Sequence, residues 1–133
     1  MVVDTSAIIA VLLRELEASH FSRALADAPR TLMSAVTRVE LSFVAEGRKG
    51  SIGRAVLEDF LRESKIEVIP VSLPHADLAL EAFRRFGRGR HRAGLNIGDC
   101  FSYALAKAAD LPLLFKGDDF IHTDIRPVLP PGR

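Results

Sequence analysis

The chain has 133 residues, of which 48% are hydrophobic and 26% are charged, and its formal net charge is +1. This length and composition predict a single globular domain over residues 1–133, and the near-neutral charge provides no overall field for a polyanionic partner. No apolar run reaches the ~18 residues of a membrane-spanning helix, no basic region opens the chain, and a single cysteine, Cys100, excludes an internal disulfide. We therefore expect a cytoplasmic protein with no membrane partner.

Short apolar segments alternate with amphipathic segments along the chain. Strands are predicted at 1–4, 31–33, 67–71 and 112–115, with a fifth at 128–129. Helices are predicted at 7–13, 15–28, 35–48, 52–64, 74–86 and 97–109, with a break at Gly47 and Gly50 and a frayed tail at 130–133. This alternation predicts an α/β fold, a three-layer α/β/α sandwich around a mostly parallel sheet of four to five strands.

Acidic residues lie beside apolar segments at several positions, namely Asp4, Glu40, Asp99 and the pair Asp118–Asp119. An unpaired carboxylate is costly to desolvate, whereas a hard divalent cation neutralises a cluster of carboxylates. Ligands of parallel sheets bind beyond the carboxyl ends of the strands, where Asp4, Asp99 and the aspartate pair are expected. The sequence therefore predicts a Mg²⁺ site, in which Mn²⁺ can substitute.

Two of these acids also fit roles in capping helices. Asp4 can cap the helix that follows it, although Thr5 or Ser6 can take that place and free the Asp4 carboxylate. Asp99 comes three residues after Asn96, a spacing typical of a capping box at a helix start.

The remaining acids have structural alternatives as well. Glu40 shares a helical stripe with Val36, Phe43 and Val44, so its alternative is a buried salt bridge rather than a solvated position. Asp118–Asp119, next to a glycine, is a common turn sequence. The combination of all four positions favours the metal site.

Five arginines without an intervening acid lie in the segment 84–92, directly before the predicted Asp99 helix. Arginine binds phosphate oxygens with two parallel hydrogen bonds, so this segment favours a nucleic-acid substrate. A solvated loop, or ion pairs with acids elsewhere in the chain, remains the alternative. The candidate substrate-binding residues are Thr5, Ser6, Arg85, Arg88, Arg90 and Arg92.

The order of these acids resembles that of the PIN-domain ribonucleases, most closely the VapC-type toxins of bacterial type II toxin–antitoxin (VapBC) modules. The similarity is carried by residues 3–7, by 34–40, by 86–91 with 94–106, and by 114–120 with 123–125. By this resemblance Asp4, Glu40 and Asp99 are catalytic metal-site acids. Asp119 matches the fourth acid better than Asp118, although many relatives have a Thr-x-Asp arrangement there; one or two metal ions stay open.

The resemblance implies a Mg²⁺-dependent endoribonuclease that leaves a 5′-phosphate and a 3′-hydroxyl on its RNA substrate. It further implies inhibition by a cognate VapB-type antitoxin, which inserts a C-terminal segment with an arginine into the acidic pocket. A homodimer is also implied, and we expect its interface near Leu57, Phe60 and Leu61. A non-catalytic RNA-binding module of PIN-like fold and another Mg²⁺-dependent phosphoryl hydrolase remain as alternatives.

Overall fold

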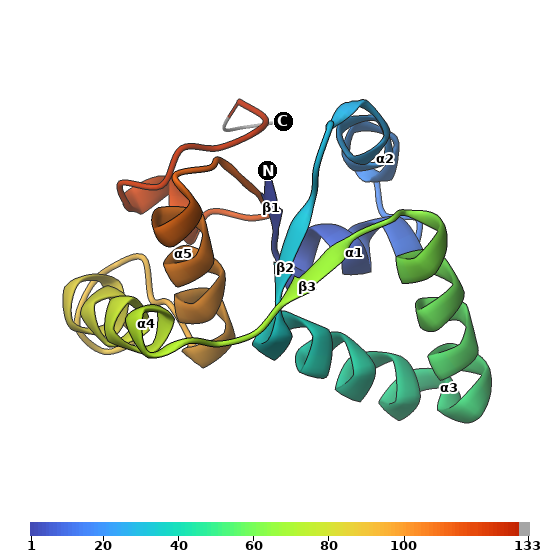
Figure 1. Ribbon diagram of the computed structural model, residues 1–133, viewed down its shortest axis with the longest axis horizontal. Helices are drawn as coiled ribbons and strands as arrows, with labels where there is room; N and C mark the ends of the chain where they lie inside the picture. The colour runs from blue at the N-terminus through green and yellow to red at the C-terminus, as the bar shows by residue number, and fades with distance from the viewer. Residues whose placement is uncertain (131–133) are drawn as a thin grey trace.

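Strands and helices alternate along residues 1–130, the part of the chain that the computed structural model describes (Figure 1). The tail at 131–133, for which we expected fraying, lies outside the described residues. The elements are β1 (Val2–Val3), α1 (Thr5–Leu12), α2 (Ala18–Asp27), β2 (Leu32–Ser34), α3 (Ala35–Glu63), β3 (Glu67–Ile69), α4 (Leu73–Phe86), α5 (Ile97–Ala109), β4 (Leu113–Leu114) and the 3₁₀ turn η1 (Phe120–His122).

The four strands form one sheet in the order β3-β2-β1-β4, and every neighbouring pair is parallel. β1 therefore lies between β2 and β4, so the residue that follows β1, Asp4, lies in the middle of the carboxyl edge. β3 is an edge strand that ends at Ile69, directly before Pro70, as expected because proline cannot donate to a sheet ladder.

The predicted fifth strand at 128–129 is reduced to a single bridge between Leu113 and Pro127. The Leu113 N–H donates to the Arg126 carbonyl (2.9 Å), and the Val128 N–H donates to the Leu113 carbonyl (3.0 Å). Pro127 and Pro130 have no N–H group, so the ladder cannot extend along this segment.

Side chains alternate across the strands and build a core on each face of the sheet. One face, covered by α4 and α5, buries Val2, Leu32 and Leu113; the other, covered by α1, α2 and α3, buries Val3, Met33 and Leu114. Figure 1 shows these two groups of helices on opposite sides of the strands. The predicted three-layer α/β/α sandwich with a parallel sheet is thus confirmed. Over residues 1–130, no helix combines the length and the apolar character that crossing a membrane requires.

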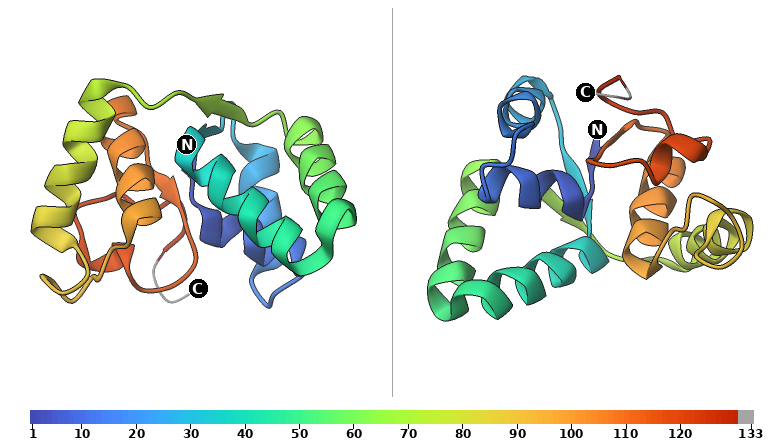
Figure 2. Two further views of the ribbon diagram at one scale, coloured as in Figure 1. Left: turned by 90° about the horizontal axis from the view of Figure 1, so that it is seen from below. Right: turned by 180° about the vertical axis from the view of Figure 1, so that it is seen from behind.

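Helix α3 turns sharply at Gly50, close to the break predicted from Gly47 and Gly50 (Figure 2). Gly50 has φ +56° and ψ −139°, a conformation that favours glycine, and the two helical arms join there without a loop. The second arm folds back over the sheet, where Leu57 (1% exposed) and Leu61 (8% exposed) join the core. The expectation that Leu57 and Leu61 lie in a dimer interface is therefore wrong, because both are buried in the protein's own core; Phe60, the third residue named there, is only partly buried.

Candidate active site at the carboxyl edge of the sheet

The Asp4 carboxylate is buried, only 3% exposed, and both of its oxygens accept hydrogen bonds. Oδ2 accepts from the Ser6 backbone N–H (3.1 Å) and from the Ser6 hydroxyl (2.7 Å). Oδ1 accepts from the hydroxyl of Ser102 on α5 (2.6 Å). Asp4 is itself the N-cap of α1, so the expectation that Thr5 or Ser6 would cap this helix instead is wrong. The extended backbone of Asp4 aims its side chain at the Ser6 N–H.

The Glu40 carboxylate is held between the starts of α1 and α5. The Thr5 hydroxyl donates to Glu40 Oε1 at 2.8 Å. On its other side Glu40 lies against Gly98, so closely that a Cβ at position 98 would overlap the carboxylate. Glycine is therefore required for this approach, and it precedes Asp99 directly.

The apolar stripe expected around Glu40 is only partly covered by the core, since Val36 and Val44 are intermediate in exposure. Phe43 is 72% exposed, and the buried side chains on the first arm of α3 are Thr37 and Leu41. Helix α3 contacts α1, α5, β2 and β3, and the exposure of Phe43 shows that part of its apolar surface nevertheless faces solvent. The carboxyl group of Glu40 is half-buried through Thr5 and Gly98 rather than through that stripe.

Asp99 forms the capping box that its spacing from Asn96 predicted. The Asp99 N–H donates to Asn96 Oδ1 (2.8 Å), and the Asn96 N–H donates to Asp99 Oδ2 (3.0 Å). Capping engages Oδ2 and fixes the side-chain rotamer, which leaves Oδ1 to the site.

Electrostatics couple the four acids. Burial, together with the charges of Asp4, Asp119 and Glu40, raises the pKa of Asp99 to about 7, against the opposing effect of the Asn96 backbone hydrogen bond. Burial also raises the pKa of Glu40, with the Thr5 hydrogen bond opposing and the Asp4 charge adding. Like charges affect one another in this way only over short distances, so Asp4, Glu40 and Asp119 lie within electrostatic range of Asp99. Such perturbed carboxylates are typical of functional sites.

The oxygen donors of these acids fit Mg²⁺ or Mn²⁺. Within residues 1–130, no three His, Cys, Asp or Glu side chains are arranged closely enough to complete a metal site by themselves. Mg²⁺ does not need such a cage, since it keeps several waters and is commonly held by one or two carboxylates together with substrate phosphates. The repulsion that raises the pKa of Asp99 is also what a bound cation relieves.

The arginines of the segment 84–92 fall into two groups: those on a hydrogen-bonded loop at 87–95, and Arg85, which is held in an ion-pair network. The loop at 87–95 is closed by hydrogen bonds from the Arg88 N–H to the Leu95 carbonyl and from the Leu95 N–H to the Phe86 carbonyl, both 3.0 Å. The side chains of Arg88, Arg90 and Arg92 are exposed. The Arg90 guanidinium lies 4.8 Å from the centre of the Phe83 ring. These arginines are therefore accessible to a ligand.

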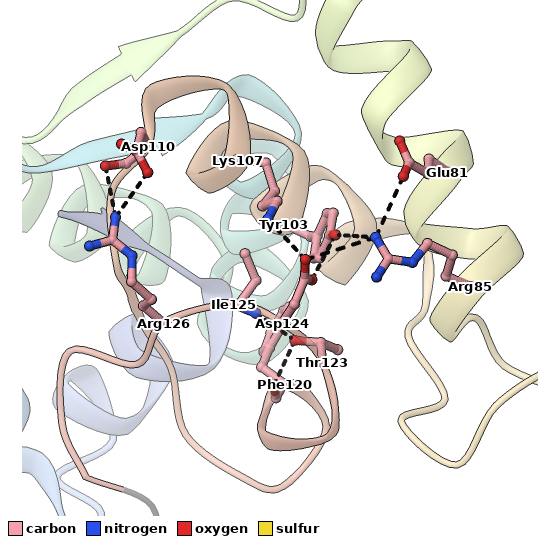
Figure 3. A network of polar contacts seen from close by, with 10 residues as sticks. All are labelled: Glu81, Arg85, Tyr103, Lys107, Asp110, Phe120, Thr123, Asp124, Ile125 and Arg126. Atoms are coloured by element: carbon pink, nitrogen blue, oxygen red, sulfur yellow. Dashed lines mark hydrogen bonds and ion pairs between the residues drawn. The ribbon is translucent and has the colours of Figure 1, made fainter.

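Arg85 instead belongs to a network that ties the C-terminal segment to α4 and α5 (Figure 3). Its Nη1 is 3.8 Å from Asp124 Oδ2, 3.5 Å from Glu81 Oε1 and 3.4 Å from the Tyr103 hydroxyl. Asp124 also accepts from the Tyr103 hydroxyl (2.8 Å) and from Lys107 Nζ (2.9 Å). Burial acts to raise the pKa of Asp124. The hydrogen bonds that Lys107 and Tyr103 donate outweigh this effect and hold the pKa below its usual value.

Two polar residues of the site were not identified from the sequence as part of it. Ser102 and Thr37 are both fully buried, and their side-chain oxygens are 3.3 Å apart. The available signal was the position of Ser102, which interrupts an apolar helix three residues after Asp99 and therefore shares its face. Thr37 lies on α3, three residues before Glu40, where the spacing gives the same indication.

Comparison with known proteins agrees with this architecture. Residues 1–126 match the model of the PIN domain. VapC ribonuclease Mb0640 of Mycobacterium bovis is 47% identical over 131 residues, which are 98% of this chain and 100% of that protein. Ribonuclease VapC of Mycolicibacterium smegmatis is 47% identical over 128 residues, 96% and 99% of the two chains. The chain belongs to the PIN-domain family and, within it, to the VapC ribonucleases.

Solved structures share the fold at low sequence identity. VapC20 of Mycobacterium tuberculosis, described as a sarcin–ricin loop cleaving toxin, superposes with a TM-score of 0.76 at 19% identity, covering 97% of this chain and 98% of that one. A toxin–antitoxin complex from Klebsiella pneumoniae gives 0.67 at 20% identity, with 92% of each chain covered. At these identities the likeness establishes the fold alone. The resemblance predicted from the sequence is thus confirmed at the level of family and fold.

Proposed function

We propose that this protein is a Mg²⁺-dependent endoribonuclease toxin that hydrolyses RNA phosphodiester bonds. The observation that carries the proposal is the buried Asp4 carboxylate at the carboxyl edge of the sheet, near enough to Asp99 that burial and the charges of Asp4, Asp119 and Glu40 raise the pKa of Asp99 to about 7. The names of its relatives, VapC ribonucleases from mycobacteria, support the same chemistry.

The acids take different parts in this proposal. Asp4 and Asp99 would hold the cation most directly, since hydrogen bonds from Ser6 and Ser102 orient the Asp4 carboxylate and one from the Asn96 N–H orients that of Asp99. Glu40, oriented by Thr5, would bind through water or direct the attacking water toward phosphorus. Asp119 would add a second, weaker ligand position. When bound, Mg²⁺ supplies Lewis-acid chemistry: it lowers the pKa of water, polarises the phosphoryl oxygen and stabilises the leaving oxygen.

Substrate binding falls to the exposed arginines of the loop at 87–95. Arg88, Arg90 and Arg92 would pair with RNA phosphates, which fixes the position of the strand without reading its sequence. The Thr5 hydroxyl donates to Glu40 and the Ser6 hydroxyl to Asp4. Their contribution to substrate binding would therefore be indirect, through the orientation of those carboxylates.

The first experiment incubates purified, partner-free protein with total RNA and Mg²⁺ or Mn²⁺, beside EDTA. Asp4→Asn and Asp99→Asn are expected to abolish cleavage while the fold survives, because each removes a charge that the cation requires. Asp77→Asn, an exposed change of the same kind on α4, serves as the matched control. Full activity in a folded, metal-loaded Asp4→Asn or Asp99→Asn protein would refute the site. Turnover of a small phosphate ester without RNA cleavage would favour another phosphoryl hydrolase.

We also propose that a VapB-type antitoxin inhibits the protein through the same pocket. One structural neighbour is a toxin–antitoxin complex, and a cationic side chain would compete with metal for the carboxylates. Asp4→Asn is then expected to weaken the complex in a calorimetric titration, and unchanged affinity would count against insertion into the pocket. A homodimer remains part of the proposal, tested by sedimentation, with its interface elsewhere than at Leu57 and Leu61.

A further inference from the structure

We propose that Thr37 and Ser102 form a buried hydroxyl relay that positions the Asp4 carboxylate for metal binding. The inference rests on the proposed function and adds two residues to it. Thr37 lies on α3 and Ser102 on α5, both are 0% exposed, and they are 65 positions apart in the chain. The relay links the two helices that carry Glu40 and Asp99 to the acid at the end of β1.

Counting protons gives the relay a single direction. A serine or threonine hydroxyl has one proton to donate, whereas an ionised carboxylate only accepts. The Ser102 hydroxyl lies 2.6 Å from Asp4 Oδ1, a length typical of a donor to a charged oxygen, so its proton is used there. Its contact with Thr37 Oγ1, at 3.3 Å, must then be a bond that Thr37 donates. Thr37 thus acts on Asp4 through Ser102 and is a positioning residue.

Counting acceptor sites identifies the oxygen of Asp4 that remains free. The two carboxylate oxygens together offer about four lone-pair sites. Ser6 occupies both sites on Oδ2 through its N–H and its hydroxyl, and Ser102 occupies one site on Oδ1. The remaining site is on Oδ1, the oxygen that Ser102 orients. We infer that Oδ1 is the oxygen that binds the cation and that the relay fixes its direction.

The alternative explanation is that Thr37 only packs between α3 and α5, and it requires a different property of the side chain at position 37. Packing depends on the shape and volume of the Thr37 side chain, and the relay depends on its proton. Thr37→Val keeps the shape and removes the donor, while Thr37→Ser keeps the donor and removes a methyl group. The two variants therefore distinguish the explanations. The relay predicts a larger loss of metal affinity in Thr37→Val, and packing predicts a larger loss in Thr37→Ser.

The test measures binding of Mn²⁺ to the full chain without RNA, from the electron paramagnetic resonance signal of the free ion. Loss of an outer-shell partner commonly weakens metal affinity about 10- to 100-fold. We expect Thr37→Val to weaken Mn²⁺ binding by about tenfold, at the lower end of that range, and Thr37→Ser to restore most of it, although Thr37→Ser melts at a lower temperature. Ser102→Ala removes the donor without adding volume, so it is expected to fold and to lose at least as much affinity.

The outcomes distinguish the relay from the proposed function. If Asp4→Asn binds Mn²⁺ as the wild type does, the metal site is wrong and the relay falls with it. If Asp4→Asn loses Mn²⁺ while Thr37→Val and Ser102→Ala bind normally, only the relay is overturned. Greater loss of affinity in Thr37→Ser than in Thr37→Val would show that packing, and not the proton, is what the site requires.

Discussion

The Glu40 carboxylate packs directly on Gly98, the residue before Asp99 on α5. This contact brings two acids together that are 59 positions apart in the chain, and a side chain larger than hydrogen at position 98 would have to displace Glu40. The helix backbone at Gly98 therefore acts as one wall of the site, with Thr5 holding Glu40 from the other side.

The first prediction concerns Gly98→Ala. In an ordinary helix interior, replacing glycine with alanine stabilises by about 0.5–1 kcal/mol, but here the methyl group must displace the flexible Glu40 side chain. We expect a melting temperature close to that of the wild type and RNA cleavage reduced at least tenfold. Gly47→Ala is the control, since a Cβ there meets nothing within 4 Å. Wild-type cleavage by Gly98→Ala would show that the position of Glu40 is unimportant.

The second prediction concerns pH and Asp99. Its pKa is about 7 in the folded protein and 3.8 in the unfolded reference, so between these values the folded state retains a proton that the unfolded state releases. Stability without metal should therefore fall as pH rises from about 4 to about 7. Asp99→Asn is expected to be more stable than the wild type at pH 8, by about 1–2 kcal/mol after allowance for partial exposure. The gain should shrink at pH 5.

Thermal melts in EDTA at pH 5 and pH 8 would measure this difference. The amide oxygen introduced by Asp99→Asn is able to accept the hydrogen bond that the Asn96 N–H donates, so the helix cap persists in the variant. Equal stability of the two proteins at pH 8 would mean that ionised Asp99 does not destabilise the folded state.

The third prediction concerns stabilisation by Mg²⁺. An ion that binds only the folded state stabilises it by about 2.7 kcal/mol at 100 times its dissociation constant. Because a proton on Asp99 competes with the ion, the rise in melting temperature should be larger at pH 8 than at pH 6. Asp99→Asn should lose most of the rise at both values. If the rise in melting temperature were the same at both pH values, Mg²⁺ binding would not involve Asp99.

The fourth prediction separates two kinds of arginine. Arg90→Ala should weaken RNA binding and lower the dependence of log affinity on log salt by about 0.7, the value for one phosphate contact on a single strand. Arg85→Ala should chiefly lower stability, by about 1 kcal/mol, because its partly exposed ion pairs with Asp124 and Glu81 hold the C-terminal segment. Filter binding over a salt series, with urea unfolding of both variants, would compare them. If Arg85→Ala lost more RNA affinity than Arg90→Ala, Arg85 would be the RNA-binding residue and the roles proposed for the two arginines would be wrong.

Local features of the fold and the site were predictable from the sequence. The capping box of Asn96 and Asp99 depends on residues three apart, and the break at Gly50 on a residue that adopts positive φ. Strands read from apolar runs gave the correct layers because parallel sheets bury both faces of each strand.

Features that depend on distant pairs were not predictable in the same way. The Asp4–Ser102 bond spans 98 positions, and no local pattern indicates it. Helical spacing around Glu40 correctly marks an apolar face on α3 but does not say whether another element covers it, and Phe43 is exposed. Burial of Leu57 depends on the direction in which the chain leaves Gly50, which the glycine alone does not determine.

The pairing of β1 with β4 determines when the site can form during synthesis. Asp4 is synthesised before α5 and β4, but its backbone N–H bonds to the Leu114 carbonyl, and its carboxylate bonds to Ser102. Until the chain through β4 has emerged, the central strand lacks one neighbour and the acid lacks its partner. A nascent chain that ends before α5 and β4 therefore carries Asp4 and Glu40 without the contacts that hold Asp4 in place, so this arrangement forms only late in synthesis of the domain.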